Sequence, residues 1–173
     1  MIPYTGRRED KRLVTGHGQY TSDFNLPGQL HACFLRSDYA HARILSIDTS
    51  AAKAAPGVRL VLTGEDFATG QFKTMIPMAQ FPGRGGFKIR VPDRLPLAHK
   101  KVNFGGEAVA LVLADTAAQA RDATELITVD YEELPAVIGF DRALAPDAPT
   151  VHENVPGNIT FDWDYGDEAK TNE

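Results

Sequence analysis

A continuous apolar run that ends in a helix start lies at Ala108-Val-Ala-Leu-Val-Leu-Ala-Asp-Thr-Ala-Ala118. Its first seven residues predict a buried strand, because no polar residue interrupts them. At the end of that strand, Asp115 and Thr116 can accept hydrogen bonds from the first free N–H groups of a helix. The helix is expected over Thr116–Glu125 and a second strand over Ile127–Tyr131. The run therefore predicts a strand–helix–strand unit.

The same pattern occurs earlier in the chain in a shorter form. A strand expected at Ala42–Asp48 leads into Asp48-Thr-Ser-Ala-Ala52, where a helix of about two turns is predicted. Pro56-Gly57 ends this helix, and Val58–Leu62 is predicted as the next strand. A further strand is expected before both units, at Leu30–Arg36. The expected core consists of largely buried apolar side chains from the two units: Leu60, Leu62, Leu111, Val112, Leu113 and Ile127.

Composition places the chain among ordinary globular proteins. Of its 173 residues, 43% are hydrophobic and 24% are charged, which argues against wholesale disorder. The formal net charge of −5 gives no general attraction to nucleic acid or to an anionic membrane, so neither is expected as a partner. The longest apolar run is far below the ~20 residues that span a bilayer, and Met1–Arg12 lacks the apolar segment of a signal peptide. A cytoplasmic protein is expected.

Three segments differ in composition from the two units. An N-terminal arm is charged and contains several glycines, and the acidic tail Asn154–Glu173 has little apolar periodicity. Between the units, Thr69–Lys100 is rich in Gly, Pro and Phe. It contains several basic residues but only one acidic residue, Asp93. We therefore expect Thr69–Lys100 to be the most mobile internal segment of the isolated chain. The expected organisation is an arm over 1–21, one domain over 22–137 and a linker over 138–173.

Residues able to carry chemistry occur singly rather than in constellations. Cys33 lies within a strand pattern, where a small buried hydrophobe is the common outcome, and Glu107 follows two glycines in an expected turn. The neighbours Glu132 and Glu133 point to opposite faces of a strand, so they do not serve one reacting bond. Gly83-Arg-Gly-Gly86 neither follows a strand nor opens a helix, which gives little support to nucleotide binding. The histidines show no metal-ligand spacing: His17, His31, His41, His99 and His152. No catalytic, cofactor-binding or metal-binding residue is therefore expected in this chain.

Seven segments, taken in order, resemble the opening of the large, molybdenum-cofactor-carrying subunit of the xanthine oxidase and aldehyde oxidase family, especially its carbon monoxide dehydrogenase-like members. They are Arg8-Glu-Asp-Lys-Arg-Leu-Val-Thr-Gly-His-Gly-Gln-Tyr20, Leu26-Pro-Gly-Gln-Leu-His31, Arg36-Ser-Asp-Tyr-Ala-His-Ala-Arg-Ile44, Pro56-Gly-Val-Arg-Leu-Val-Leu-Thr-Gly64, Lys101-Val-Asn-Phe-Gly-Gly-Glu-Ala-Val-Ala110, Val129-Asp-Tyr-Glu-Glu-Leu-Pro-Ala-Val137 and His152-Glu-Asn-Val-Pro-Gly-Asn158. The sequence departs from the family pattern at Ala108, where proline is common. Because the segments extend over nearly the whole chain, the resemblance is specific.

The resemblance implies an α+β fold, the α/β-hammerhead domain that opens those large subunits. It also implies a structural role, docking the catalytic domains and an iron–sulfur subunit. The complete enzyme would hydroxylate aldehydes or N-heterocycles with water as the oxygen source, or oxidise carbon monoxide. Its molybdopterin cofactor would lie in later domains, with iron–sulfur clusters, and FAD in some members, on partner subunits or domains. No catalytic or cofactor-binding residue is carried over to this chain.

Two other interpretations stay open. In the first, the chain is a stand-alone binding module that uses residues 69–100 to bind a small ligand or a partner. In the second, it is a natural split subunit whose catalytic portion is a separate chain. The docking interpretation adds an expectation for the tail. Phe161, Trp163 and Tyr165 alternate, which places all three on one side of an extended segment. We expect them to form an exposed aromatic surface that receives a partner.

Overall fold

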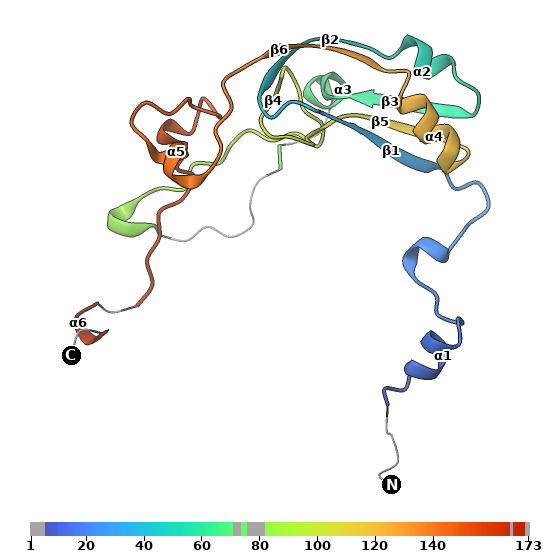
Figure 1. Ribbon diagram of the computed structural model, residues 1–173, viewed down its shortest axis with the longest axis horizontal. Helices are drawn as coiled ribbons and strands as arrows, with labels where there is room; N and C mark the ends of the chain where they lie inside the picture. Colours follow the sequence, from blue (N-terminus) through green and yellow to red (C-terminus); the bar gives the residue numbers. More distant parts are fainter. Residues whose placement is uncertain (1–5, 71–73, 76–81, 167, 172–173) are drawn as a thin grey trace.

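The computed structural model describes residues 6–70, 74–75, 82–166 and 168–171, and it contains two small antiparallel sheets (Figure 1). The first sheet has the strand order β1 (His31–Arg36), β5 (Ala108–Ala114), β3 (Val58–Thr63). The second sheet has the strand order β4 (Lys101–Val102), β2 (Ala42–Asp48), β6 (Thr128–Glu133). The middle strands, β5 and β2, are therefore hydrogen-bonded along both edges. The architecture is the α+β class that the sequence predicts.

Both predicted strand–helix–strand units are present, and each crosses from one sheet to the other. The chain passes from β2 through helix α2 (Ser50–Ala54) into β3, and from β5 through helix α4 (Ala117–Thr124) into β6. Helix α4 packs on β1 and β5, and α2 packs on β3 (Figure 1). Because the two strands of each unit belong to different sheets, the units join the sheets instead of extending one of them.

In each unit a side chain at the end of the strand accepts a hydrogen bond from the start of the helix, although the N-cap residue of α2, Thr49, makes no capping bond through its side chain. Asp48 Oδ1 accepts a hydrogen bond from the Ser50 N–H at 2.9 Å. Hydrogen bonds from Ser50, first from its side chain and then from its backbone, lower the pKa of the Asp48 carboxyl. Thr116 Oγ1 accepts from the N–H three residues further on at 3.2 Å. The turn after α2 places Gly57 at φ 78°, and the Gly57 carbonyl accepts from Asp115 N–H at 2.9 Å. The end of one unit's helix is thereby tied to the helix start of the other.

The core lies between the β1–β5–β3 sheet, the two helices and the second sheet. Val61 and Val112 from the first sheet contact Ala52 of α2 and Ala123 of α4, together with Ile127. A second buried cluster lies beside the β4–β2–β6 sheet and consists of Ala42, Ala98, Val102 and Val109. The two clusters share the partly buried neighbours Ile47 and Val129. The core is therefore continuous, and it is built mostly from alanine and valine.

Only some of the residues predicted to form the core are buried, because neighbouring residues of a strand point to opposite faces of the sheet. Val112 and Ile127 are buried as predicted. The prediction for Leu60 is wrong, because 44% of its surface is exposed. The other predicted leucines are only partly buried: Leu62, Leu111 and Leu113. The four leucines form two cross-strand pairs, Leu60 with Leu113 and Leu62 with Leu111, whereas Val61 pairs with Val112. The leucines thus point to the face of the sheet away from the helices.

Three elements in or beside the segment Thr69–Lys100 were not predicted, and one of them is the short strand β4. Helix α3 (Gly64–Thr69) begins with a capping box, in which the Thr63 N–H donates to Asp66 Oδ2 at 2.7 Å. A Cβ on Gly64 would lie 2.1 Å from the Ala98 carbonyl oxygen, so the close approach requires glycine. A 3-10 turn, η2 (Arg84–Gly86), lies further along the loop.

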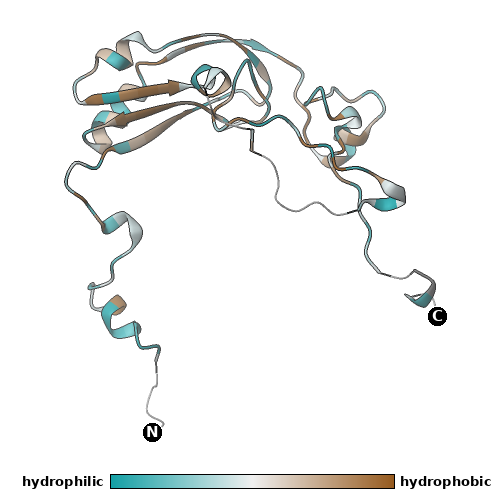
Figure 2. Ribbon diagram, turned by 180° about the vertical axis from the view of Figure 1, so that it is seen from behind, coloured by the Kyte–Doolittle hydropathy of each residue, from teal (hydrophilic) through white to brown (hydrophobic). Residues whose placement is uncertain are grey.

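The remaining short elements lie outside the sheets: α1 (Asp10–Val14), η1 (Thr21–Asp23), α5 (Phe140–Leu144), η3 (Pro156–Asn158) and α6 (Glu168–Thr171). The two ends of the chain extend as arms on the same side of the sheets (Figure 1). The apolar residues concentrate on the strands (Figure 2). Within the ranges described above, no helix combines the length and the apolar character needed to cross a membrane.

Adjacent residues of β3 provide a test of the burial pattern. Val61→Ala removes two buried carbons and is expected to lower the free energy of unfolding by about 2 kcal/mol, from ~0.8 kcal/mol per CH₂ plus a cavity term. Leu60→Ala removes three carbons but should cost less than about 1 kcal/mol, because the side chain is half exposed. Urea melts of the two variants measure both values. An equal or larger loss for Leu60→Ala would contradict the assigned faces.

Candidate docking surface of the loop and the tail

The basic loop and the tail lie along each other, although about 70 residues separate them in sequence. Arg84 N–H donates to the Asp162 carbonyl at 3.0 Å, and Arg90 N–H donates to the Thr160 carbonyl at 2.9 Å. The Arg90 guanidinium also donates to the Pro156 carbonyl at 2.8 Å. These backbone bonds give residues 83–90 and 156–162 a fixed position relative to each other. Sequence reasoning missed the pairing, although the opposite charges of the two segments signalled it.

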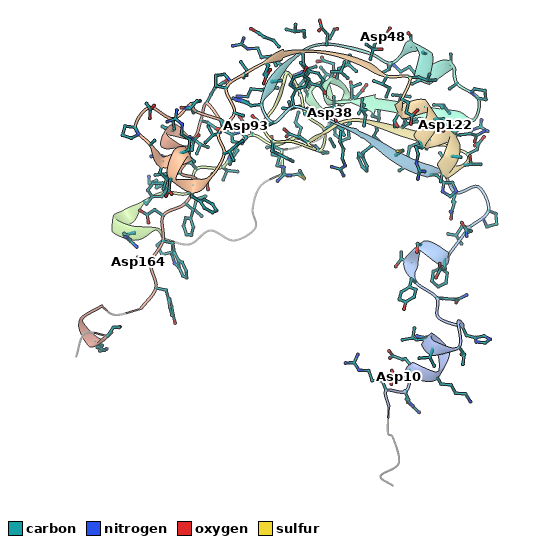
Figure 3. All side chains as sticks on the ribbon, viewed as in Figure 1. Asp10, Asp38, Asp48, Asp93, Asp122 and Asp164 are labelled. Carbon is teal, nitrogen blue, oxygen red and sulfur yellow. The ribbon has the colours of Figure 1, made fainter. Side chains whose placement is uncertain are left out.

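Ion pairs accompany the backbone bonds. Arg84 Nε lies 3.7 Å from a carboxylate oxygen of Asp162 and 3.7 Å from one of Asp164, and Asp164 lies on the tail (Figure 3). The side chains are largely exposed, so each pair contributes little stability. The tail thus supplies Arg84 with two acids, whereas the segment Thr69–Lys100 itself contains only Asp93. The mobility of Thr69–Lys100 in the isolated chain stays a prediction; residues 71–73 and 76–81 lie outside the described residues.

Three aromatic side chains form a stacked row on the tail. Phe161 and Trp163 have ring centroids 6.5 Å apart, and Trp163 and Tyr165 have centroids 5.9 Å apart. The interplanar angles are 19° and 26°, so the alternating residues share one side as the sequence predicted. Trp163 is 51% exposed and Tyr165 is 91% exposed. A stacked aromatic row with this exposure is typical of a contact surface for another protein segment.

A cleft between β4 and the segment after α5 gathers several ionisable side chains. Lys101 and His152 both line it. Lys101 Nζ donates to the Val151 carbonyl at 2.8 Å and lies 3.6 Å from Glu153 Oε1, so its charge is partly compensated. The lining also includes Asp93, His99, Lys100, Asn103 and Asn154. The cleft therefore holds charges of both signs, and it does not present a purely basic surface.

Of the candidate histidines, His99 and His152 line the same cleft and His41 is close enough to affect the pKa of His152, while the other candidate residues lie elsewhere. His41 Nδ1 donates to the Pro135 carbonyl at 2.8 Å, and His99 lies 2.9 Å from Glu65. Cys33 Sγ faces Thr124 Oγ1 at 3.9 Å. His17 contacts Thr15 on the arm, and His31 is in β1. Among the residues that the structure describes, no group of three or more His, Cys, Asp or Glu side chains is placed to hold a metal ion.

Two of the three glutamates singled out in the sequence, Glu107 and Glu132, have structural partners. Glu107 Oε2 accepts from the Asn103 N–H at 2.6 Å, which closes the turn before β5. Glu132 forms an ion pair with Arg43 across β2 and β6 at 2.7 Å. The buried atoms His41 Nε2 and Asn103 Oδ1 lack a hydrogen-bond partner among the described atoms. Each suits a water molecule or another hydrogen-bond donor.

Two antiparallel sheets joined by two strand–helix–strand units define the class of this chain as an α/β-hammerhead domain. The family model described as "Aldehyde oxidase and xanthine dehydrogenase, a/b hammerhead domain" matches residues 15–135. The chain belongs to this family.

Relatives match along most of the chain. The carbon monoxide dehydrogenase large chain of Afipia carboxidovorans is 40% identical over 177 residues, covering 95% of this chain and 20% of that protein. The nicotine 6-hydroxylase large subunit of Paenarthrobacter nicotinovorans is 42% identical over 153 residues, covering 88% and 18%. The crystal structure of quinoline 2-oxidoreductase from Pseudomonas putida 86 is 46% identical with a TM-score of 0.72, covering 82% and 17%. The chain thus spans about a fifth of the length of these relatives.

Gly83 offers a test of the loop–tail pairing. A Cβ on Gly83 would lie 2.7 Å from the Asp162 carbonyl oxygen and 2.6 Å from the Phe87 carbonyl oxygen, so Gly83→Ala should separate the two segments. Trp163 is the only tryptophan, and its quenching by acrylamide should rise. The rise is at most about twofold, because the side chain is already 51% exposed. Gly105→Ala, with no atom within 4 Å of the new Cβ, should leave quenching unchanged. Equal quenching in both variants would refute the pairing.

His152 gives the chain a predicted pH dependence. Burial is the main cause that lowers the pKa of His152, with help from the positive groups Lys101, His41 and Arg94, while Asp93 opposes them. A lowered pKa means that the unfolded chain binds more protons between the folded value and 6.5, so stability rises with pH across that window. The free energy of unfolding should therefore fall as the pH drops below about 6.5.

Chemical melts at a series of pH values between 7.5 and 5 measure this dependence. His152→Gln should flatten the profile, whereas His17→Gln on the exposed arm should leave its slope unchanged. An unchanged slope in His152→Gln would assign the pH dependence to other groups.

Proposed function

We propose that this chain is the N-terminal docking domain of a molybdenum hydroxylase large subunit. The observation that carries the proposal is coverage: relatives match 88–95% of this chain with only 18–20% of their own length. Several of these relatives are large subunits, and one from Eubacterium barkeri is the large molybdopterin subunit of nicotinate dehydrogenase. A chain with this relation to its relatives supplies a structural part of the enzyme.

The complete enzyme is proposed to hydroxylate aldehydes or N-heterocycles with water as the oxygen source, or to oxidise carbon monoxide. The relatives are named for substrates of these classes, among them carbon monoxide, nicotine and quinoline. A molybdopterin cofactor would supply the oxidation of the substrate. By its resemblance to the family, the cofactor is proposed to lie in the domains that follow, and no residue of this chain is proposed to bind it.

The proposed partners are the downstream molybdenum-binding domains and an iron–sulfur subunit, with FAD on a further subunit or domain in some members. The proposed organisation is an arm over 1–21, the hammerhead domain over 22–137 and a linker over 138–173. The protein is proposed to be cytoplasmic. The aromatic row of Phe161, Trp163 and Tyr165 lies on the linker, and two of its members, Trp163 and Tyr165, are at least half exposed. Its proposed role is to contact the first of the following domains.

The test compares this chain with the product of its complete coding region. We expect the complete protein to contain about one molybdenum per large subunit and to reduce a dye with an aldehyde, an N-heterocycle or carbon monoxide. The isolated 173-residue chain should contain no stoichiometric molybdenum and should reduce no dye. Elemental analysis and dye assays measure both properties.

Three outcomes separate the interpretations. An in-frame molybdenum domain directly downstream supports the docking domain, and a separate adjacent reading frame indicates the split subunit. Stoichiometric molybdenum or dye reduction with the isolated chain would refute the proposal. A complete coding region without any molybdenum domain, nearby or in frame, would leave the stand-alone binding module.

A further inference from the structure

The outward face of the β1–β5–β3 sheet is apolar across all three strands. Two cross-strand rows form this outer face: Phe34–Leu111–Leu62 and Ala32–Leu113–Leu60. Phe34 is 46% exposed and Leu60 is 44% exposed. The opposite face of the same strands contacts helices α2 and α4. A sheet with apolar side chains on both faces is typical of a sheet covered on both faces.

The second sheet shows what a solvent-facing surface looks like in this same chain. Arg43 and Glu132 form an ion pair across β2 and β6 at 2.7 Å, with both side chains at least half exposed. Thr128 pairs with Asp48 in the same register, and Asp130 pairs with Ser46. The outward residues of the β4–β2–β6 sheet are therefore mostly polar, and the exception is Leu45 at the β2 irregularity, which is 58% exposed. The outward face of the β1–β5–β3 sheet therefore has the composition of a buried surface, and that of the β4–β2–β6 sheet has the composition of a solvent-exposed surface.

Charged groups border the outer face at its two ends. At one end Arg36 lies over the Phe34 ring, 5.8 Å from its centroid, and donates to the Gly106 carbonyl at 2.8 Å. At the other end Arg59 and Asp115 form a bidentate ion pair with both distances 2.8 Å. An uncharged centre with a polar rim is the anatomy of a protein interface. The partner surface must itself be uncharged where it meets the two rows, because burying an unpaired charge there is costly.

We propose that the outer face is covered by an uncharged aliphatic or aromatic surface of the remaining part of the large subunit. The proposal rests on the proposed function, since it takes this chain as a part of that subunit. About four fifths of the length of the relatives lies outside the region that this chain matches, so a partner in the same polypeptide is available at a high local concentration.

The size of the face favours such a partner over a second copy of this chain. The face offers six side chains, and its two most exposed large ones, Phe34 and Leu60, are less than half exposed. A standard interface between separate proteins takes roughly 20–30 residues a side. A covalently linked domain needs less contact area, because linkage removes most of the association entropy that separate proteins lose.

Thiol probes test the proposal directly. In a Cys33→Ala background, Leu60→Cys and, separately, Ala32→Cys place one thiol on the outer face. Asp130→Cys places the control thiol on the polar face of the second sheet. Rates of maleimide labelling are measured in the isolated 173-residue chain and in the complete large subunit. We expect labelling at positions 60 and 32 to be at least tenfold slower in the complete subunit, and labelling at 130 to change less than twofold.

The labelling rates distinguish a covered outer face from an uncovered one. Equal rates at 60 and 32 in the two proteins would overturn the proposal, and two probe positions guard against one variant that misfolds. Slow labelling in the isolated chain that speeds up on dilution would also overturn it, because a second copy would then be the cover. The molybdenum content of the same complete subunit reports on the proposed function separately. A subunit with full molybdenum and fast labelling at 60 and 32 would refute only the covered face.

Discussion

The fold depends on the position of β5 at the centre of the first sheet. Its backbone is hydrogen-bonded to β1 on one edge and to β3 on the other, and its side chains are apolar on both faces. One face meets α2 and α4 through Val112 and Ala110, which are fully buried. The helices approach this closely because they present alanine: Ala52, Ala120 and Ala123 are at most 1% exposed. Small residues on the helices and branched residues on the strand thus fill one thin layer.

This layer gives the domain a small core. Among the described residues, the largest fully buried side chains are four valines and one leucine, of which only Val112 belongs to this layer: Leu97, Val102, Val109, Val112 and Val155. Since hydrophobic stabilisation grows with the apolar area removed from water, a core of alanine and valine stabilises less per residue than one of leucine and phenylalanine. The leucines of β3 and β5 are present in the sequence, but they lie on the outer face. Covering that face would add the larger side chains to the domain's buried area, which links its stability to its assembly.

The loop and the tail form a second, weaker level of organisation. Backbone hydrogen bonds hold Arg84 and Arg90 against the tail, while the exposed ion pairs of Arg84 add little. The aromatic row projects from this pairing. The outer face and the aromatic row share one chemistry, since both offer uncharged apolar side chains that are partly open to water. Glu107 and Glu132, by contrast, have structural roles: Glu107 closes a turn, and Glu132 pairs with Arg43.

The sequence by itself determined the elements that depend on local order. The bounds of Ala42–Asp48 and Ala108–Ala114 agree with β2 and β5, because apolar runs and capping residues act within a few residues of one another. Ordered segments from Arg8 to Asn158 also indicated the family. Two features came only from the tertiary structure. An all-apolar strand such as β5 carries no polar alternation to mark its covered face, so the outward position of Leu60 and Leu113 followed from cross-strand register and the placement of the helices. The pairing of the loop with the tail joins residues far apart in the chain. A local sequence pattern does not specify which distant segment will accept hydrogen bonds from the backbone of a loop.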